Sequence, residues 1–576
     1  MGKLAPAPRA IFSGVTPPAR PDPHEVPRWW WASVAVALVA VAASATSLGN
    51  GFAMDDVPIV EANAVVRDAA HWWHRFAESY WPPSRGGGLY RPLPMLAYTA
   101  LWAAGHGASA PFHWANVALY LALCLVVLRL ARAVLGERGA VAAALLFAAH
   151  PVHVEAVANT VGLAELLAAI PMVLAVAFYL ERRRAGVMTS RDVAVLALLY
   201  ALACLSKENG AMLPLLLLVA ELILGPHDPV RWRRLVPLAA ALGVVAVAYL
   251  AARAAALSGV KGEFPHVVWA TSSVTTRHLT MLGVSLEWLR LLFWPARLSA
   301  EYSPPNIPVI TGWSWWLVPA ALLVCGVKGV AVFGWRRWPV AAFASAWLVI
   351  TLFPVSNTLV VAGLILAERT LLVPSVAAVL IAGWAFERLI QSERATVTRA
   401  VRAMAVGIVG LLVVAGTWRS ATRATVWHDN ERLFEQTVRD VPDAYRAHYH
   451  LGAWYLDHGR LLDAERELRA AIALYGRDYE PRAYLAEAYR KHDLCTPALP
   501  LYREALAIVP RAGLPRAGYV ACLIGAAQYD SARAVARRGI GKGWEADAEL
   551  QRLLSVADSV ERAQAIPTKP AAVARE

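Results

Sequence analysis

Residues 29–48 read WWWASVAVALVAVAASATSL, a run of 20 residues without a charged side chain. About 20 apolar residues in a helix are enough to cross the hydrocarbon core of a bilayer. The run is longer than the roughly 7–15 apolar residues of a signal peptide, so we expect an uncleaved membrane span. Ten further apolar segments predict 11 spans in all. The others are 112–131, 139–150, 160–180, 193–205, 209–225, 235–252, 314–335, 339–357, 371–389 and 400–418.

The composition of the 576-residue chain agrees with a membrane protein. Hydrophobic residues make up 58% and charged residues 17%, whereas soluble domains carry about 45–50% and about 25%. A soluble enzyme, a disordered protein and a disulfide scaffold are excluded. Residues 1–418 hold 32 Lys and Arg against 21 Asp and Glu, while residues 419–576 hold 23 against 21. The second segment therefore has the charge density of a soluble domain.

These shifts predict an all-α protein in which a polytopic membrane helical bundle precedes a soluble helical repeat array. Residues 1–28 contain seven prolines and predict a disordered cytoplasmic tail. The membrane domain is expected over 29–418 and the repeat domain over 419–562. A second disordered tail is expected over 563–576.

The basic residues predict the orientation of the bundle. Cytoplasmic loops of membrane proteins are enriched in Lys and Arg. If the apolar stretches 92–106 and 279–297 lie at the interface instead of spanning, six basic clusters fall on one side. This arrangement puts the N-terminus in the cytoplasm and the repeats outside, on the periplasmic face of an inner membrane. The charge of +13 then sets topology, and no nucleic-acid partner is expected. The clusters begin at Arg9, Arg129, Arg182, Arg231, Lys328 and Arg388.

The same orientation gathers several polar groups on the external face. A charge at bilayer depth costs about 2.5–3.5 kcal/mol on insertion scales, so such residues are functional candidates. Together they predict the walls of one polar cavity. They are Asp55, Asp56, Arg91, His150, His153, Glu155, Lys207, Glu208, Glu368 and Arg369.

Asp55 and Asp56 open the long external loop 49–91. A carboxylate here can act as a general base or hold a divalent metal, or it can cap a helix, and one of the pair could do each. Arg91 suits bidentate phosphate recognition or simple snorkelling at the headgroups. His150, His153 and Glu155 could bind zinc, but Pro151 interrupts the helix and polar lining is the more economical interpretation.

The cations of the later loops suit a phosphate as well. Lys207 lies in a tight turn between two short spans, with Glu208 expected to orient it or to act as a second ligand. Arg369 is expected either to pair with Glu368 or to neutralise a leaving phosphate.

The soluble part shows a 34-residue period typical of tetratricopeptide repeats. Ala464 recurs as Ala498 and Ala532, Tyr455 as Tyr489, and Ala471 as Ala505. Such arrays offer a concave surface for a peptide or protein, although they can also serve only as a stabilising cap. Cys495 and Cys522 lie far apart in this sequence, so we expect no disulfide framework.

Six short motifs, in this order, are similar to the transmembrane and tetratricopeptide repeat (TMTC-type) O-mannosyltransferase family and its prokaryotic relatives. The resemblance implies a GT-C glycosyltransferase fold and a sugar donor linked to polyprenyl phosphate on the outer face. It also implies that an acidic residue of the first external loop is the base, which corresponds to Asp55 or Asp56. The motifs are FAMDD (52–56), YRPL (90–93), HPVHVEA (150–156) with GLAEL (162–166), SKE (206–208) and ERTLLVPS (368–375).

The function implied by this resemblance is transfer of a sugar, such as mannose, to a hydroxyl of a protein acceptor held by the repeats. Inversion would follow from a single displacement, with Arg91, Lys207 and Arg369 on the lipid phosphate. Dependence on a divalent metal (Mg²⁺ or Mn²⁺) stays open. The alternatives are a lipid-linked glycan ligase or lipid-sugar modifier of the same fold, and a non-catalytic membrane-anchored repeat scaffold. Animal members carry many more repeats, so the identity of the acceptor does not carry over.

Overall fold

The structure is a computed structural model that describes residues 29–82, 88–186, 188–226, 231–258, 267–270, 272–394, 396–541 and 546–565. The tail predicted over 1–28 lies outside these residues, and so does 566–576. Residues 563–565, the first three of the predicted C-terminal tail, belong to the last helix, which ends at Ala565. The domain boundaries stay predictions.

The described residues form helices and loops with no β-strand, which confirms the all-α prediction. Sixteen of these helices belong to the first 424 residues. They are α1 (Trp29–Ser44), α2 (Ala64–Arg67), α3 (Pro92–Gly105), α4 (Ala110–Val134), α5 (Glu137–Ala148), α6 (Val154–Ala158), α7 (Leu163–Ala185), α8 (Ser190–Ser206), α9 (Leu213–Leu224), α10 (Arg231–Ala256), α11 (Val267–Ala270), α12 (Val274–Phe293), α13 (Val318–Phe333), α14 (Pro339–Leu352), α15 (Ser375–Ile390) and α16 (Arg399–Ala424).

Each of the 11 predicted spans coincides with one of these helices, but their lengths divide them into two groups. Among the described residues six helices are long and apolar enough to cross a membrane, or seven if the bent pair Glu137–Ala148 and Pro151–Ala158 counts as one span. The helices at the other five predicted spans have 12 to 17 residues. The count of 11 therefore stays a prediction. The six are Trp30–Gly49, Ala110–Val134, Thr160–Ala185, Leu235–Ala256, Trp315–Arg336 and Arg399–His428.

Small residues set the packing inside the bundle. Helices α5 and α15 lie against each other, and a Cβ added to Gly139 would come within 2.7 Å of the Gly383 carbonyl oxygen. Because real Cβ atoms do not come that close, the two backbones can approach only through glycine. Ala140, Ala143 and Ala144 are fully buried on the same helix. The short helices are thus held by close contact with neighbours.

The second part is built of helices that pack against their neighbours in the chain. A Cβ on Gly452 would come within 2.7 Å of Leu468, so α18 and α19 meet at a glycine. Ala464, Ala498 and Ala532, which recur at the predicted spacing, are fully buried. The tetratricopeptide assignment itself stays a prediction. The helices are α17 (Asn430–Asp440), α18 (Tyr445–Asp457), α19 (Leu461–Leu474), α20 (Glu480–Lys491), α21 (Cys495–Ile508), α22 (Gly513–Gly525), α23 (Tyr529–Arg537) and α24 (Asp547–Ala565).

The expectation that Cys495 and Cys522 stay unpaired is wrong. They form a disulfide with a Cα–Cα distance of 5.3 Å. The two cysteines are 27 residues apart in sequence, but α21 and α22 pack together and bring them into contact. Separation along the chain was therefore a poor guide to separation in space.

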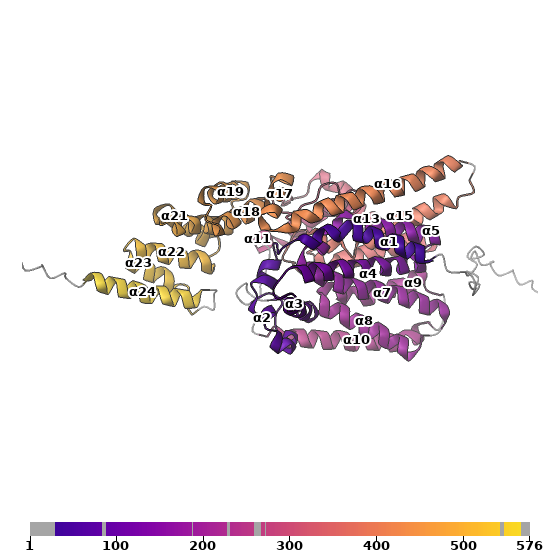
Figure 1. The fold of residues 1–576 in the computed structure, drawn as a ribbon, viewed down its shortest axis with the longest axis horizontal. Coiled ribbons are helices and arrows are strands. Elements are labelled where there is room, and N and C mark those ends of the chain that lie inside the picture. The colour runs from indigo at the N-terminus through magenta and orange to yellow at the C-terminus, as the bar shows by residue number, and fades with distance from the viewer. Residues whose placement is uncertain are drawn as a thin grey trace, which may run out of the picture.

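The repeat array extends from one end of the bundle (Figure 1). Helix α1 starts at the opposite end, and α16 runs the length of the bundle to reach α17 at the array. The chain returns to the loop after α1 at this junction: the Gly51 N–H donates to the His428 carbonyl at 2.8 Å, and the Asn50 amide donates to the Ala424 carbonyl at 2.9 Å.

Candidate functional site

The Asp55–Asp56 loop lies at the end of the bundle where the repeat array begins. It connects a 3₁₀ turn (Ala45–Gly49) to a π turn that starts at Val57. Met54, the residue before Asp55, has φ = 53°, a left-handed conformation that is costly for a residue with a side chain. Its N–H donates to Asn430 Oδ1 of α17 at 2.6 Å. A residue of the repeat part therefore holds the backbone next to Asp55.

Asp56 points into the protein and acts as a cap. It is 1% exposed, and its carboxylate accepts from the N–H groups of Ala53 at 3.3 Å, Thr160 at 3.0 Å and Val161 at 2.8 Å. Burial raises the pKa of Asp56 to about 7, although the three N–H groups oppose the shift. These contacts assign Asp56 to fixing the loop against the turn that precedes α7.

Asp55 points the other way, toward Arg369. Its side chain is 21% exposed, and its Oδ2 accepts from Arg369 Nη2 at 3.1 Å. Arg369 also donates to Glu155, from Nη1 at 2.6 Å and from its backbone N–H at 2.8 Å. One guanidinium thus joins the first loop, the segment after α5 and the segment before α15.

Arg91 precedes α3 and pairs with Glu208, which follows α8. Arg91 Nε lies 3.2 Å and 3.1 Å from the two carboxylate oxygens, and Nη2 lies 2.8 Å from Oε2. The guanidinium sits 4.7 Å from the centre of the Tyr80 ring. Although burial favours the neutral acid, Arg91 lowers the pKa of Glu208. The hydrogen bonds of Glu208 therefore go to Arg91 and not to Lys207, which corrects one of the two expected roles. Its role as a second ligand stays a prediction.

Lys207 pairs with Glu165 on α7. The Lys207 side chain is 14% exposed, and burial lowers the pKa of its ammonium group while Glu165 opposes the shift. Glu165 was not among the candidates, although it lies inside the quoted GLAEL motif. The sequence does contain a signal for Glu165, because it is an acidic residue within an apolar run. Burying such a charge costs free energy unless a partner is present.

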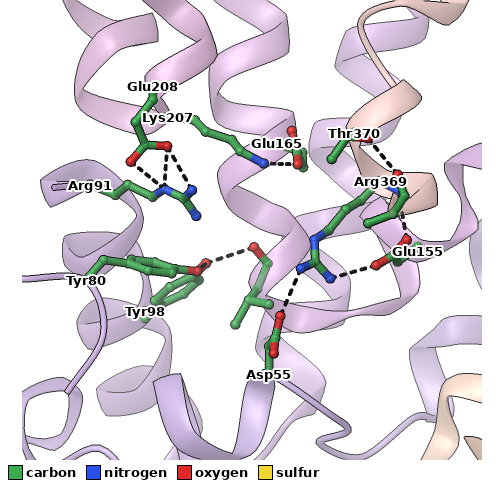
Figure 2. Close-up of polar contacts among 12 residues, drawn as sticks. Asp55, Tyr80, Arg91, Tyr98, Glu155, Glu165, Lys207, Glu208, Arg369 and Thr370 are labelled. Carbon is green, nitrogen blue, oxygen red and sulfur yellow. Dashed lines mark hydrogen bonds and ion pairs between the residues drawn. The ribbon is translucent and has the colours of Figure 1, made fainter. Parts of the chain in front are cut away.

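Seven charged side chains thus form one group, which we call the charge cluster (Figure 2). Electrostatic interactions link its pairs, since Arg91 interacts with Glu165, and Lys207 with Arg91 and Arg369. The predicted convergence of distant motifs is therefore observed for six of the ten candidates. The members are Asp55, Arg91, Glu155, Glu165, Lys207, Glu208 and Arg369.

His150 and His153 lie apart from the charge cluster. His153 is 2% exposed, with Nδ1 3.0 Å from the Tyr120 hydroxyl and Nε2 2.8 Å from Ser375 Oγ. His150 Nε2 lies 3.0 Å from the Leu292 carbonyl oxygen. No group of three His, Cys, Asp or Glu in the described part of the chain is placed to hold a metal. The hydrogen bonds of His153 connect α4 and α15 in the core, and the bond of His150 connects the turn after α5 to α12.

The expected Glu368–Arg369 ion pair does not form. Glu368 Oε1 accepts from the Ser299 N–H and the Tyr302 hydroxyl, each at 2.6 Å. Glu368 is 1% exposed, and burial raises its pKa to about 7. Adjacent residues in a helical turn point in different directions. Glu368 and Arg369 therefore contact different partners although they are neighbours in the chain.

Several proteins that are similar to this chain in sequence are protein O-mannosyl-transferases. The chain is 25% identical over 443 residues to one from Caenorhabditis elegans, covering 74% of this chain and 60% of that protein. It is 33% identical over 282 residues to Tmtc2 of Drosophila melanogaster, covering 46% and 30%. It is 26% identical over 492 residues to human TMTC4, covering 76% and 65%. No known family profile matches the chain.

These relatives confirm the resemblance that the motifs indicated: the chain is related to the TMTC-type O-mannosyltransferases. It spans less than two thirds of the length of each of these three proteins. Among solved structures it resembles the archaeal oligosaccharyltransferase AglB from Archaeoglobus fulgidus. That likeness has a TM-score of 0.40 and 14% identity, and it covers 74% of this chain and 59% of the other.

Proposed function

We propose that this protein is a membrane glycosyltransferase that moves a sugar from a polyprenyl-phosphate donor to a hydroxyl of a protein acceptor. The observation that carries the proposal is the charge cluster, in which a partly exposed carboxylate, Asp55, contacts Arg369 and two further cations, Arg91 and Lys207, belong to the same group. The relationship to protein O-mannosyl-transferases supports the class of reaction and favours mannose as the sugar.

The cations suit the donor phosphate. Arg91 and Arg369 carry planar guanidinium groups that can bind two phosphate oxygens at once, and Lys207 adds a point charge. Each cation is paired with a carboxylate of the cluster. A phosphate that bound here would compete with those carboxylates, so the protein would exchange existing ion pairs for contacts to the donor.

Asp55 is the residue of the acidic pair that suits the base. Asp56 is committed to three backbone N–H groups, whereas in the part of the chain that the structure describes the Asp55 carboxylate accepts its hydrogen bond from the Arg369 side chain, at 3.1 Å. In the reaction the acceptor hydroxyl oxygen bonds to the anomeric carbon and its proton passes to Asp55. The bond from that carbon to the phosphate oxygen breaks, and the phosphate keeps the electron pair. Attack from the opposite face inverts the configuration.

We further propose that the site faces the outside of the cytoplasmic membrane and that the repeats bind the acceptor protein. The repeat array lies at the end of the bundle opposite the start of α1 (Figure 1). The backbone next to Asp55 is bonded to Asn430 of α17, the first helix of that part of the chain. The Cys495–Cys522 disulfide supports an external array, because disulfides persist in oxidising compartments. The Lys and Arg clusters that the sequence predicts on one side of the membrane support a cytoplasmic N-terminus.

The experiment incubates purified protein with radiolabelled polyprenyl-phosphate mannose and extracted envelope proteins, and measures label on protein. Asp55→Asn should abolish transfer. Glu61→Gln is the matched control, because Glu61 is an exposed carboxylate of the same loop. Asp56→Asn should lower the amount of folded protein instead. Label that appears on lipid and not on protein would indicate the ligase alternative, and wild-type transfer that persists in Asp55→Asn would refute the assignment of the base.

A divalent metal is a separate proposal for the same assay. Asp55 and Glu155 are the carboxylates of the charge cluster that could contact Mg²⁺ or Mn²⁺ beside a phosphate. Both accept from Arg369, so a metal would have to displace that side chain. Loss of transfer in EDTA that Mg²⁺ or Mn²⁺ restores would support a metal, and full activity in EDTA would exclude one.

A further inference from the structure

A cavity of about 590 Å³ lies between three helices of the membrane part. Helix α14 packs against both α9 and α13, and these three helices, with the turn after α13, supply all ten residues that line the cavity. Ligand pockets in proteins commonly measure about 300–1,000 Å³. The cavity is therefore large enough to hold part of a bound molecule.

The walls of the cavity suit an acyl chain. Nine of the ten lining residues are hydrophobic, and Lys328 is the tenth. Two of them are open to the outside of the bundle, since Leu222 of α9 is 39% exposed and Val332 of α13 is 61% exposed. Helix α13 belongs to a segment long and apolar enough to cross a membrane, so lipid surrounds this opening. Water would find few polar partners inside, and an acyl chain is the better occupant.

Lys328 brings a positive charge into these apolar walls. It lies five residues before the end of α13 at Phe333, about 7–8 Å along the helix axis. Its side chain is exposed, and it forms no ion pair or hydrogen bond with another residue in the described part of the chain. A charge in an apolar span is costly, and a lysine near a helix end lowers this cost by extending toward the headgroups. An anionic headgroup at the opening would neutralise Lys328.

The turn after α13 indicates where the headgroups lie. Trp335 lines the cavity and Trp338 is 43% exposed, and tryptophan is enriched where a membrane meets water. Arg336 lies 4.7 Å from the centre of the Trp335 ring. Arg337 lies 5.3 Å from the centre of the Trp338 ring. Both arginines are exposed, so they add two cations at the same end of α13 as Lys328.

This cavity is separate from the charge cluster. None of its lining residues belongs to that cluster. On α9 the lining begins at Val219, eleven positions after Glu208, and continues toward the end of the helix that leads away from the cluster. The basic residues of the sequence predict that the Lys328 end of α13 is cytoplasmic. Basic pockets between helices on that side of a membrane bind anionic lipid headgroups.

We propose that this cavity binds an anionic phospholipid of the cytoplasmic leaflet. One acyl chain fills the space between α9, α13 and α14, and the Lys328 ammonium group contacts the phosphate, with Arg336 and Arg337 beside it. The lipid supplies packing that the protein does not, because Ala320 is the only buried residue of α13. The proposal does not depend on the glycosyltransferase function, since it uses no residue of the charge cluster.

The test titrates detergent-purified protein with phosphatidylglycerol, and separately with phosphatidylcholine of the same acyl chains, and measures bound lipid by native mass spectrometry. The wild type should half-saturate at a phosphatidylglycerol concentration at least about tenfold lower than that of phosphatidylcholine. Lys328→Ala should reduce this preference about fivefold and leave the binding of phosphatidylcholine unchanged.

Two further variants separate the cation from the cavity. Arg399→Ala is the matched control and should keep the preference, because Arg399 is an exposed cation at the start of α16 that does not line the cavity. Ala331→Trp places a large ring among the lining residues and should weaken the binding of both lipids. Should Lys328→Ala fold poorly, Lys328→Gln replaces it with the same expected result.

Other outcomes overturn the proposal. Equal binding of the two lipids by the wild type, an undiminished preference in Lys328→Ala, or the same loss in Arg399→Ala would show that Lys328 does not select the headgroup. Unchanged binding in Ala331→Trp would place the acyl chain elsewhere. Displacement of phosphatidylglycerol by inorganic phosphate would indicate a phosphate site without a chain. Displacement by polyprenyl phosphate at a lower concentration than by unlabelled phosphatidylglycerol would assign the cavity to the sugar donor.

Discussion

The contact between Met54 and Asn430 allows a prediction about a residue that lies outside the charge cluster. Met54 has φ = 53° and its N–H donates to Asn430 Oδ1 at 2.6 Å. A left-handed conformation costs a residue with a side chain roughly 1–2 kcal/mol. The bond from Asn430 offsets part of that cost. Asn430→Ala should therefore let the backbone relax and carry Asp55 away from Arg369.

The size of the effect follows from the bond that is lost. A hydrogen bond of this kind contributes about 0.5–1.5 kcal/mol net. That free energy corresponds to an equilibrium constant for the observed loop conformation reduced by roughly two- to twelvefold, at about 1.4 kcal/mol per factor of ten. The maximal rate of transfer from polyprenyl-phosphate mannose should fall by up to that factor, with little change in the half-saturating concentration of donor.

A second substitution separates loop strain from other effects. Glycine adopts positive φ without the steric cost, so Met54→Gly in the Asn430→Ala background should recover most of the lost rate. Arg439→Ala, on an exposed side chain of the same helix, is the control and should leave the rate unchanged. A wild-type rate in Asn430→Ala, or no recovery in the double variant, would refute the reasoning.

Three further predictions concern residues elsewhere in the protein. Burial raises the pKa of Glu368 to about 7 from 4.5, so at a pH between these values the folded protein holds a proton that the unfolded chain releases. The free energy of unfolding should therefore fall as the pH rises from about 4.5 to about 7. Glu368→Gln should flatten this dependence in thermal melts of detergent-solubilised protein. Cys495→Ser should destabilise the array by up to roughly 3–4 kcal/mol, because the disulfide limits the conformational entropy of the unfolded chain. The melting temperature of the variant should be lower than that of the oxidised wild type and equal to that of the reduced wild type. Arg91→Lys should raise the half-saturating donor concentration about tenfold, because lysine cannot reproduce the two-pronged contact that guanidinium makes; an unchanged value would place the donor phosphate elsewhere.

Sequence reasoning located the helices well because hydrophobic runs report directly on burial and length. It could not decide how many helices cross the membrane, since five of the matching helices have only 12 to 17 residues. It also offered Glu208 as a partner of Lys207 and Glu368 as a partner of Arg369, each as one of two alternatives, because it treated neighbours in the chain as possible partners. Each of these four side chains finds its partner on a distant segment instead.

The sequence alone determined the class of protein and the segments that carry its charged residues. A charged residue within an apolar run is costly, and it can be recognised without knowing the structure. Only the tertiary structure decided which of those residues act together. Asp55 and Asp56 are chemically identical and adjacent, yet one faces Arg369 and the other is closed off by three backbone N–H groups. That choice depends on the direction in which each side chain leaves the backbone, and the direction is set by packing against segments more than 100 residues away in the chain.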